Sequence, residues 1–174
     1  MTGLRDFSGA VEPLSGELPR VQFRWDAETE ILSGALEHVE GARGLTGSIE
    51  LEDAKGSIIT LDLTGGVMRA LEVVVWPSTK IVPGLTPPAA EREGRLIVPS
   101  RVSQPGIALL EVDVTLFAEW TPDQSVIHLQ VGTRRRSEAV ALADNLVLEL
   151  DGSGELAGFW LLNVPPFPDT EGEQ

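Results

Sequence analysis

Residues 57–77 read SIITLDLTGGVMRALEVVVWP, and residues 145–165 read NLVLELDGSGELAGFWLLNVP. In each stretch apolar residues recur at every second position, and glycines interrupt the alternation. This pattern is typical of a β-hairpin, because successive side chains of a strand point to opposite faces and glycine permits a tight turn. The two stretches therefore predict two related hairpins.

The two halves of the chain match in three blocks of core-facing positions, which occur in the same order in both. The matched pairs are Val21 with Leu116, Phe23 with Ala118, Trp25 with Trp120, Leu32 with Ile127, Leu61 with Leu148, Leu63 with Leu150, Gly66 with Gly154, Met68 with Leu156, Leu71 with Phe159, Val74 with Leu162 and Pro77 with Pro165. We therefore expect an internal duplication and an all-β fold. The expected architecture is two related antiparallel units of four to five strands, packed as a sandwich or partly closed barrel with pseudo-two-fold symmetry.

The chain divides by composition into five segments. They are an irregular N-terminal arm (1–20), a first β-unit (21–77), a proline-rich connector (78–106), a second β-unit (107–166) and an acidic tail (167–174). Prolines weaken strand pairing, so we expect the connector to cross between the units, which together form one compact domain.

Some local predictions can be checked against a structure. Alternation predicts one long strand over 107–120, and short edge strands around Ile81 and Leu96 in the connector. One helical turn fits residues 88–93. Residues 137–144 suit either a strand or a short helix, and we favour the strand because the matching segment of the first half alternates.

The second hairpin resembles the YuzE-like domains, a family of small bacterial and archaeal domains. Those domains show an acidic turn followed by G-x-L-x-G and an apolar strand, and Asp151, Gly154, Leu156 and Gly158 match this pattern within residues 112–164. In the first half the segment TGG (64–66) replaces the acidic turn, and Ala70 stands in place of the second glycine. The resemblance implies two tandem copies of that fold. No enzymatic activity is established for the family, so the resemblance does not imply a function.

Composition and charge restrict the possible partners. The chain has 174 residues, 42% of them hydrophobic, with a formal net charge of -14 and no cysteine. This charge repels nucleic acid, and the absence of cysteine excludes disulfides, thiolate metal sites and cysteine nucleophiles. No apolar run is long enough to span a bilayer. We expect a cytoplasmic protein with no nucleic acid or membrane partner.

Residues that commonly carry out catalysis or bind metals are sparse. His38 and Glu40 offer at most two metal ligands, so we expect no metal, no cofactor and no catalytic residues, and the protein is more simply read as a non-enzyme. His128 shares the polar face of a strand with Gln130, where we expect it to be exposed to solvent. A possible polar site comprises His128, Gln130, Arg134, Arg135 and Arg136. The alternative is that the three arginines form a solvated turn.

The aromatic residues suggest a core and an interface. Trp25 and Trp120 hold equivalent places at the ends of inward faces, where we expect them in the core. The strands that contain Val74 and Trp76, and Trp160 and Leu162, are apolar on both faces. Such a strand lies in the middle of a sandwich or covers a partner, so these four residues form the possible interface.

These features favour a non-catalytic protein-binding or assembly module, which binds a protein partner or itself. A regulatory, antitoxin-like binder is a narrower form of this hypothesis. The alternative is a small-molecule-binding protein or enzyme that uses the cleft between the two units. A pocket lined by carboxylates and a histidine would favour the alternative, whereas a flat apolar patch would favour the protein-binding module.

Overall fold

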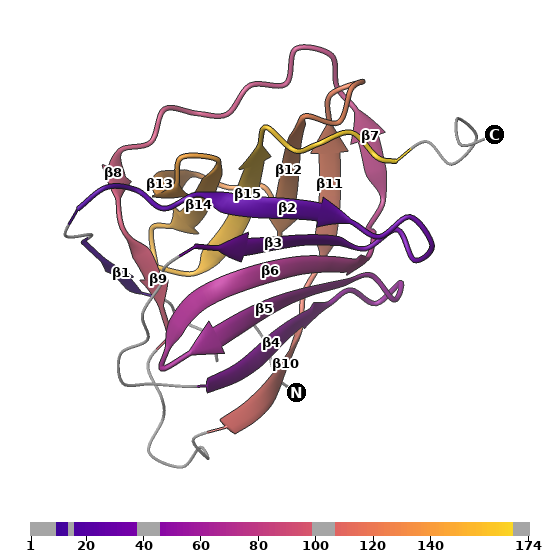
Figure 1. The fold of residues 1–174 in the computed structure, drawn as a ribbon. Coiled ribbons are helices and arrows are strands. Elements are labelled where there is room, and N and C mark those ends of the chain that lie inside the picture. The colour runs from indigo at the N-terminus through magenta and orange to yellow at the C-terminus, as the bar shows by residue number, and fades with distance from the viewer. Residues whose placement is uncertain (1–9, 14–15, 38–45, 99–106, 169–174) are drawn as a thin grey trace.

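The computed structural model describes residues 10–13, 16–37, 46–98 and 107–168, and the structural statements below refer to this described part. It is built of β-strands and contains no helix (Figure 1). Accordingly, it holds no helix with the length and apolarity needed to cross a bilayer. The strands form two mixed sheets, one of them curled into a half-barrel. The predicted all-β fold of two packed units is confirmed.

Sheet A has eight strands in the order β1-β9-β6-β5-β4-β10, and β3 pairs with both β6 and β2. The hairpin of residues 57–77 forms its centre as β5 and β6, and the turn between them uses positive φ at Gly65 and Gly66. The strands are β1 (Ala10–Glu12), β2 (Val21–Trp25), β3 (Leu32–Leu36), β4 (Thr46–Glu52), β5 (Ile58–Thr64), β6 (Val67–Val75), β9 (Arg95–Ile97) and β10 (Ile107–Asp113).

Sheet B has seven strands in the order β7-β11-β12-β15-β14-β13-β8. Its centre is the second predicted hairpin, β14 and β15, whose turn is closed by Asp151. The strands are β7 (Thr79–Ile81), β8 (Arg92–Glu93), β11 (Leu116–Trp120), β12 (Val126–Val131), β13 (Ser137–Ala143), β14 (Leu146–Asp151) and β15 (Leu156–Leu162). Residues 137–143 are thus extended, as favoured above.

The two sheets contain five-stranded units with the same connectivity. In sheet A the order is β2-β3-β6-β5-β4, and in sheet B it is β11-β12-β15-β14-β13, with every neighbouring pair antiparallel. Each strand of one unit therefore has a counterpart at the same place in the other. An internal duplication predicts this shared order.

The prediction of one strand over 107–120 is wrong. The chain leaves sheet A after β10, which pairs in parallel with β4, and enters sheet B at β11. At the corner, Val114 N donates to Glu52 O and Gly132 N donates to Thr115 O, at 2.9 and 2.7 Å. Alternation did not reveal this corner, because Val112 and Leu116 are buried on either side of it.

The described part of the connector, residues 78–98, contributes strands to both sheets. Its ends form β7 and β8, which pair in parallel with β11 and β13, and it then continues through Gly94 into β9 of sheet A. Short strands are present around Ile81 and Leu96, but only β7 lies at a sheet edge as predicted, because β9 pairs with β1 on one side and β6 on the other. The predicted helical turn is wrong. In its place, Glu91 N donates to Ala139 O at 2.8 Å and β8 follows.

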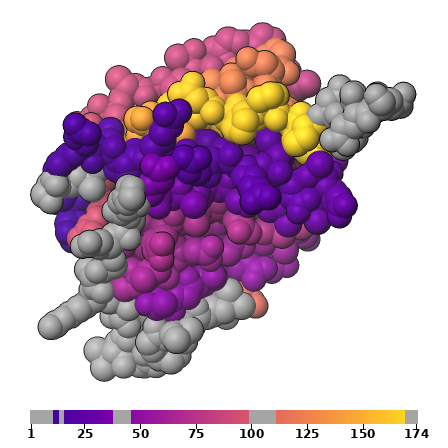
Figure 2. All heavy atoms as spheres, in the orientation of Figure 1, coloured from indigo at the N-terminus to yellow at the C-terminus, as the bar shows by residue number. Residues whose placement is uncertain are grey.

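Residues 82–91 of the connector, named the strap below, run over the outer face of sheet B (Figure 1). At one end Val82 N donates to Trp120 O of β11, and at the other end Glu91 N donates to Ala139 O of β13, each at 2.8 Å. Between these two ends, Leu85 packs against Trp160. In Figure 2 the connector (pink) lies at the top, the C-terminal part of the chain (yellow) in the middle, and the residues of sheet A (indigo to magenta) below.

The inner faces of both sheets share one hydrophobic core, which includes Phe159, Leu61 and Ile127. At one end of this core three tryptophans meet. Trp25 stacks on Trp76 with 5.6 Å between ring centroids, and Trp76 contacts Trp120 edge-on at 5.1 Å. Trp25 and Trp120 are half-buried rather than fully enclosed, yet both pack against the core as predicted.

Two polar side chains hold the sheets together. The amide of Asn145, in the turn between β13 and β14, accepts from Val21 N and donates to Val21 O, both at 2.9 Å. The carboxylate of Asp53, in the turn between β4 and β5, accepts from Leu116 N at 2.9 Å and from Lys55 N at 2.7 Å. Asp53 therefore fixes the start of β11 against sheet A.

Acid should weaken this contact. The backbone N–H groups of Leu116 and Lys55 hold the pKa of Asp53 below its ordinary value of 3.8. The unfolded chain then binds the proton at higher pH than the folded protein, so the contribution of Asp53 is complete above about pH 4 and is lost as pH falls through the folded pKa. We expect Asp53→Asn to cost ~2 kcal/mol at pH 7 and to reduce the further loss at pH 3, measured by urea unfolding.

The exposed Asp113 offers a matched control, and Asp113→Asn should leave both urea midpoints near those of the native protein. If Asp53→Asn and the native protein lost equal stability between pH 7 and pH 3, the role assigned to Asp53 would be contradicted.

Candidate functional site

A group of polar side chains lies on the outer face of sheet B, next to an apolar cluster on the same face. Glu119 of β11 is paired with His128 of β12, which is paired with Trp160 of β15. On β14, Glu149 is paired with Gly158 of β15. These side chains point away from the core shared with sheet A and toward the strap.

His128 is buried, with 7% of its surface exposed, so the prediction of a solvent-exposed histidine is wrong. Its Nε2 lies 2.6 Å from Oε1 of Glu149, and its Nδ1 lies 3.4 Å from Oε1 of Glu119. Its ring stacks on Trp160 with 4.2 Å between centroids and an angle of 20°. Alternation identified the face of the sheet correctly, but it does not report that other residues cover this face.

Glu149 reaches His128 by crossing β15, and Gly158 makes this crossing possible. A Cβ at position 158 would lie 2.7 Å from Oε1 of Glu149 and 2.5 Å from the carbonyl oxygen of Leu129. Both separations are shorter than packed atoms allow, so any larger residue would displace the carboxylate or the strand. The structure therefore requires glycine at position 158, which is the second glycine of the motif noted in the sequence.

The carboxylate of Glu149 is held in its ionised form. Its second oxygen accepts from Oγ of Ser137 at 3.2 Å. Burial alone raises the pKa of Glu149, but the hydrogen bond and electrostatic interaction with His128, together with Ser137, outweigh burial and lower the pKa below its ordinary value of 4.5. The group formed by Glu149, His128 and Glu119 is therefore a charged network in a largely buried place.

The three arginines of the loop have different roles. Arg135 binds Asp151 at 2.8 Å and also donates to the carbonyl oxygens of Val131, Thr133 and Leu156, so its guanidinium joins the loop to the β14–β15 hairpin. By contrast, 77% of the Arg134 side chain is exposed, and its Nη2 lies 3.4 Å from Oε1 of Glu119. Arg136 is exposed.

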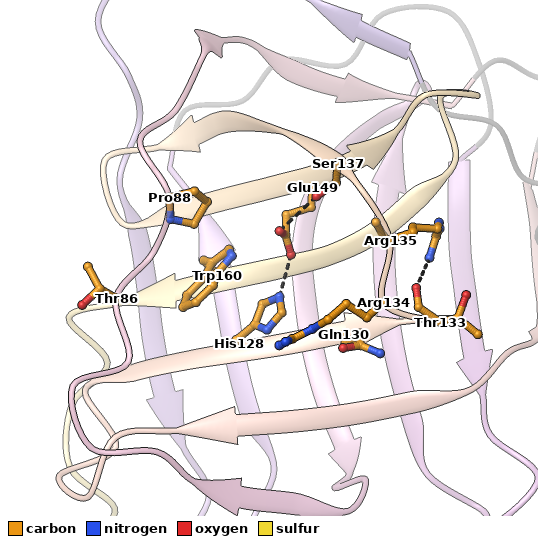
Figure 3. Close-up of a pocket in the computed structure, with 11 residues that line it drawn as sticks. Thr86, Pro88, His128, Gln130, Thr133, Arg134, Arg135, Ser137, Glu149 and Trp160 are labelled. Carbon is orange, nitrogen blue, oxygen red and sulfur yellow. Dashed lines mark hydrogen bonds and ion pairs between the residues drawn. The ribbon is translucent and has the colours of Figure 1, made fainter.

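These residues surround an open groove of about 400 Å³ between the strap and sheet B (Figure 3). Figure 3 shows Arg134 lying beside His128 and Gln130, with Trp160 and Pro88 at the other end. The groove is lined by Thr86, Pro88, His128, Gln130, Thr133, Arg134, Arg135, Ser137, Glu149, Ala157 and Trp160. The structure thus brings four residues of the predicted polar site together, while Arg136 does not line the groove.

Sequence reasoning missed Glu149 and Ser137 as members of this site. The signal that could have found them is the strand order, which places β15 between β12 and β14. With that order, Glu149 and His128 fall on the same face at nearby register positions. Alternation within one strand does not contain this information.

The residues of the predicted interface mostly contact other parts of the same chain. Trp160 is 7% exposed and packs with Leu162 and the strap residue Leu85. Trp76 packs between Trp25 and Trp120, and Val74 is half-buried. The second apolar face of β15 is thus covered by the strap. In the described part of the chain the exposed large apolar side chains are Val75 and Ile81, at 44% and 60%.

The polar side chains of the groove are arranged neither as a metal site nor as a hydrolase triad. Glu119 and Glu149 face opposite nitrogens of His128, so the three groups do not converge on one cation. No group of three metal-ligating side chains is placed to hold an ion anywhere in the described part. Ser137 donates to Glu149 and not to His128, so the groove lacks the nucleophile–base contact of a hydrolase triad. His38 lies outside the described residues.

Comparison with protein-family models and with curated proteins finds no match to this chain. The resemblance to YuzE-like domains therefore stays a prediction. The site is interpreted from its own geometry.

A double-mutant cycle tests the buried pair. We expect His128→Phe and Glu149→Leu each to cost ~3–5 kcal/mol, because each leaves a buried polar or charged group without its partner. The double variant should cost less than the sum of the two by more than about 1 kcal/mol. Urea unfolding measures all four proteins.

A second cycle that combines His128→Phe with Glu111→Leu serves as the control, since Glu111 is exposed on β10. In this control cycle the losses of stability caused by His128→Phe and by Glu111→Leu should add to the loss in the double variant. Additive effects in the His128 and Glu149 cycle as well would refute the coupled pair.

Proposed function

We propose that the protein is a non-catalytic small-molecule-binding protein and that its ligand occupies the groove between the strap and sheet B. The main support is the lining of this groove, where a buried histidine, a carboxylate and an exposed arginine converge within a pocket of about 400 Å³. Ligand sites of small molecules combine a concave surface with a few fixed polar groups of this kind. This arrangement corresponds to the alternative raised by the sequence.

The polar groups are held in fixed positions before any ligand arrives. Glu149 is bound by His128 and Ser137, and Arg135 is bound by Asp151 and three carbonyl oxygens. Groups fixed in this way lose little conformational entropy on binding, which favours affinity. The absence of an activated nucleophile in the groove favours binding over catalysis.

The proposed site differs in position from the cleft suggested by the sequence. The space between the two units is filled by the shared core, with Leu61, Ile127 and Phe159 fully enclosed. The groove belongs to the outer face of the second unit and to the strap. The proposal places the protein in the cytoplasm without nucleic acid partners, in keeping with its net charge of -14 and its lack of cysteine.

Filling the groove should abolish binding. Thr133 is exposed and lines the groove, so Thr133→Trp should obstruct it and leave the buried network intact. We expect a library of metabolites, screened by thermal shift, to contain compounds that raise the melting temperature of the native protein. Those compounds should have no effect on Thr133→Trp.

Ser153 is exposed in the turn between β14 and β15, and Ser153→Trp controls for the added indole. This variant should respond to the compounds as the native protein does. Compounds that act equally on Thr133→Trp, or a library without any binder, would contradict the proposal.

Assembly with a protein partner is a second candidate, favoured by the edge strand β7. Its three residues are exposed, Ile81 at 60%, and no described strand pairs with its outer edge. An exposed strand edge with an apolar side chain can accept a strand from another chain. The partner in this proposal is a second copy of the protein or another protein that adds a strand.

A charge at this edge should prevent such pairing. If β7 mediates self-association, sedimentation of the native protein at micromolar concentration should give a dimer, and Ile81→Glu should give a monomer. Ala54→Glu, in the exposed turn between β4 and β5, should leave the dimer intact. A native monomer, or a dimer that persists in Ile81→Glu, would exclude self-association through β7.

A further inference from the structure

The groove contains two hydrogen-bond donors that the protein itself does not satisfy. One is the Arg134 guanidinium, whose side chain is 77% exposed and whose contact with Glu119, at 3.4 Å, is long for an ion pair. The other is Nε1 of Trp160, a buried atom that has no hydrogen-bond partner among the described residues. Buried N–H groups without a partner are rare in folded proteins, because leaving one unpaired costs free energy.

The other charged groups at the groove are more fully engaged. Oε1 of Glu149 faces His128, and Oε2 accepts from Ser137. The neighbouring cation Arg135 donates to Asp151 and to carbonyl oxygens. Among the charged groups that line the groove, the Arg134 guanidinium is therefore the one most available to a ligand.

We propose that the groove binds a small organic oxyanion, a carboxylate or a phosphate ester, with its charged group on Arg134. This inference rests on the proposed function and names the class of ligand. The Arg134 guanidinium pairs with the oxyanion through charge-assisted hydrogen bonds, for which its planar fork is suited. The body of the ligand lies along the stacked rings of His128 and Trp160.

The strap supplies the upper wall of this site. Thr86 and Pro88 line the groove from above, and the strap is tied to sheet B at Val82 and Glu91. A volume of about 400 Å³ is in the range for a small organic molecule and too small for a folded domain or a nucleic acid strand.

Four probes of the same shape separate the possible classes of ligand. Benzoate and phenyl phosphate carry the two oxyanions, benzamide is uncharged and benzylamine is a cation. Affinities are measured by calorimetry for the native protein, for Arg134→Gln and for Arg136→Gln. Arg136 is the matched control, since it is a neighbouring exposed arginine outside the groove. The indole N–H signals are followed by NMR, with the Trp160 signal assigned from Trp160→Phe.

We expect at least one of the two anions to bind more tightly than benzamide and benzylamine. The ratio of the affinities for benzoate and phenyl phosphate identifies the preferred oxyanion. Arg134→Gln should weaken that binding by about 10- to 100-fold, the range for a charge-assisted hydrogen bond, and Arg136→Gln should change it less than about twofold. Binding should shift the Trp160 indole signal and leave the other three tryptophan signals in place.

The remaining outcomes separate this inference from the proposed function. Binding of benzamide or benzylamine that Thr133→Trp abolishes, and that Arg134→Gln does not change, would refute the oxyanion class while keeping the groove as a ligand site. Failure of both anions to bind at millimolar concentration would also refute this class. If, in addition, the metabolite library contained no binder, the proposed function itself would be wrong.

Discussion

Sheet B carries apolar side chains on both faces, and sheet A can cover only one of them. Phe159 and Leu161 of β15 lie in the shared core, while Trp160 and Leu162 point the other way. An exposed face of this kind would cost free energy in water, so some other element has to cover it. The strap does so, with Leu85 packed on the cluster of Ala139, Val147 and Trp160, and the strands on either side of it, β7 and β8, extend sheet B. The proline-rich connector is therefore part of the fold.

The groove forms because the strap covers only part of the outer face of sheet B. Leu85 reaches the apolar part of the outer face, around Trp160 and Val147, whereas the neighbouring part carries His128 and Glu149. Buried polar groups need partners, and here they find them across β15 because Gly158 has no side chain. A fixed polar network next to an incomplete cover leaves a concave, partly open surface. The proposed ligand site is thus a consequence of covering the outer face of the sheet.

The shared strand order of the two units places their outer faces in equivalent positions, yet the chemistry of these faces differs. The register that pairs Glu119 with His128 and His128 with Trp160 in sheet B pairs Arg24 with Ser33 and Ser33 with Glu72 in sheet A. Only the sheet B set combines a stacked aromatic pair with a strap. Equivalent backbone positions therefore supply a place for a site, and the side chains with their cover decide whether one forms.

The sequence by itself determined the strands, the glycine turns and the similar course of the two halves. Those features depend on side-chain alternation and turn preferences, which act between residues that are close along the chain. Tertiary structure alone decided that residues 107–120 cross between sheets, that the strap covers Trp160, and that His128 is buried against Glu149. The reason is that the alternation of one strand shows which side chains share a face, whereas the neighbours of that face come from distant segments. Burial of His128 depends on those neighbours, and no pattern within β12 contains them.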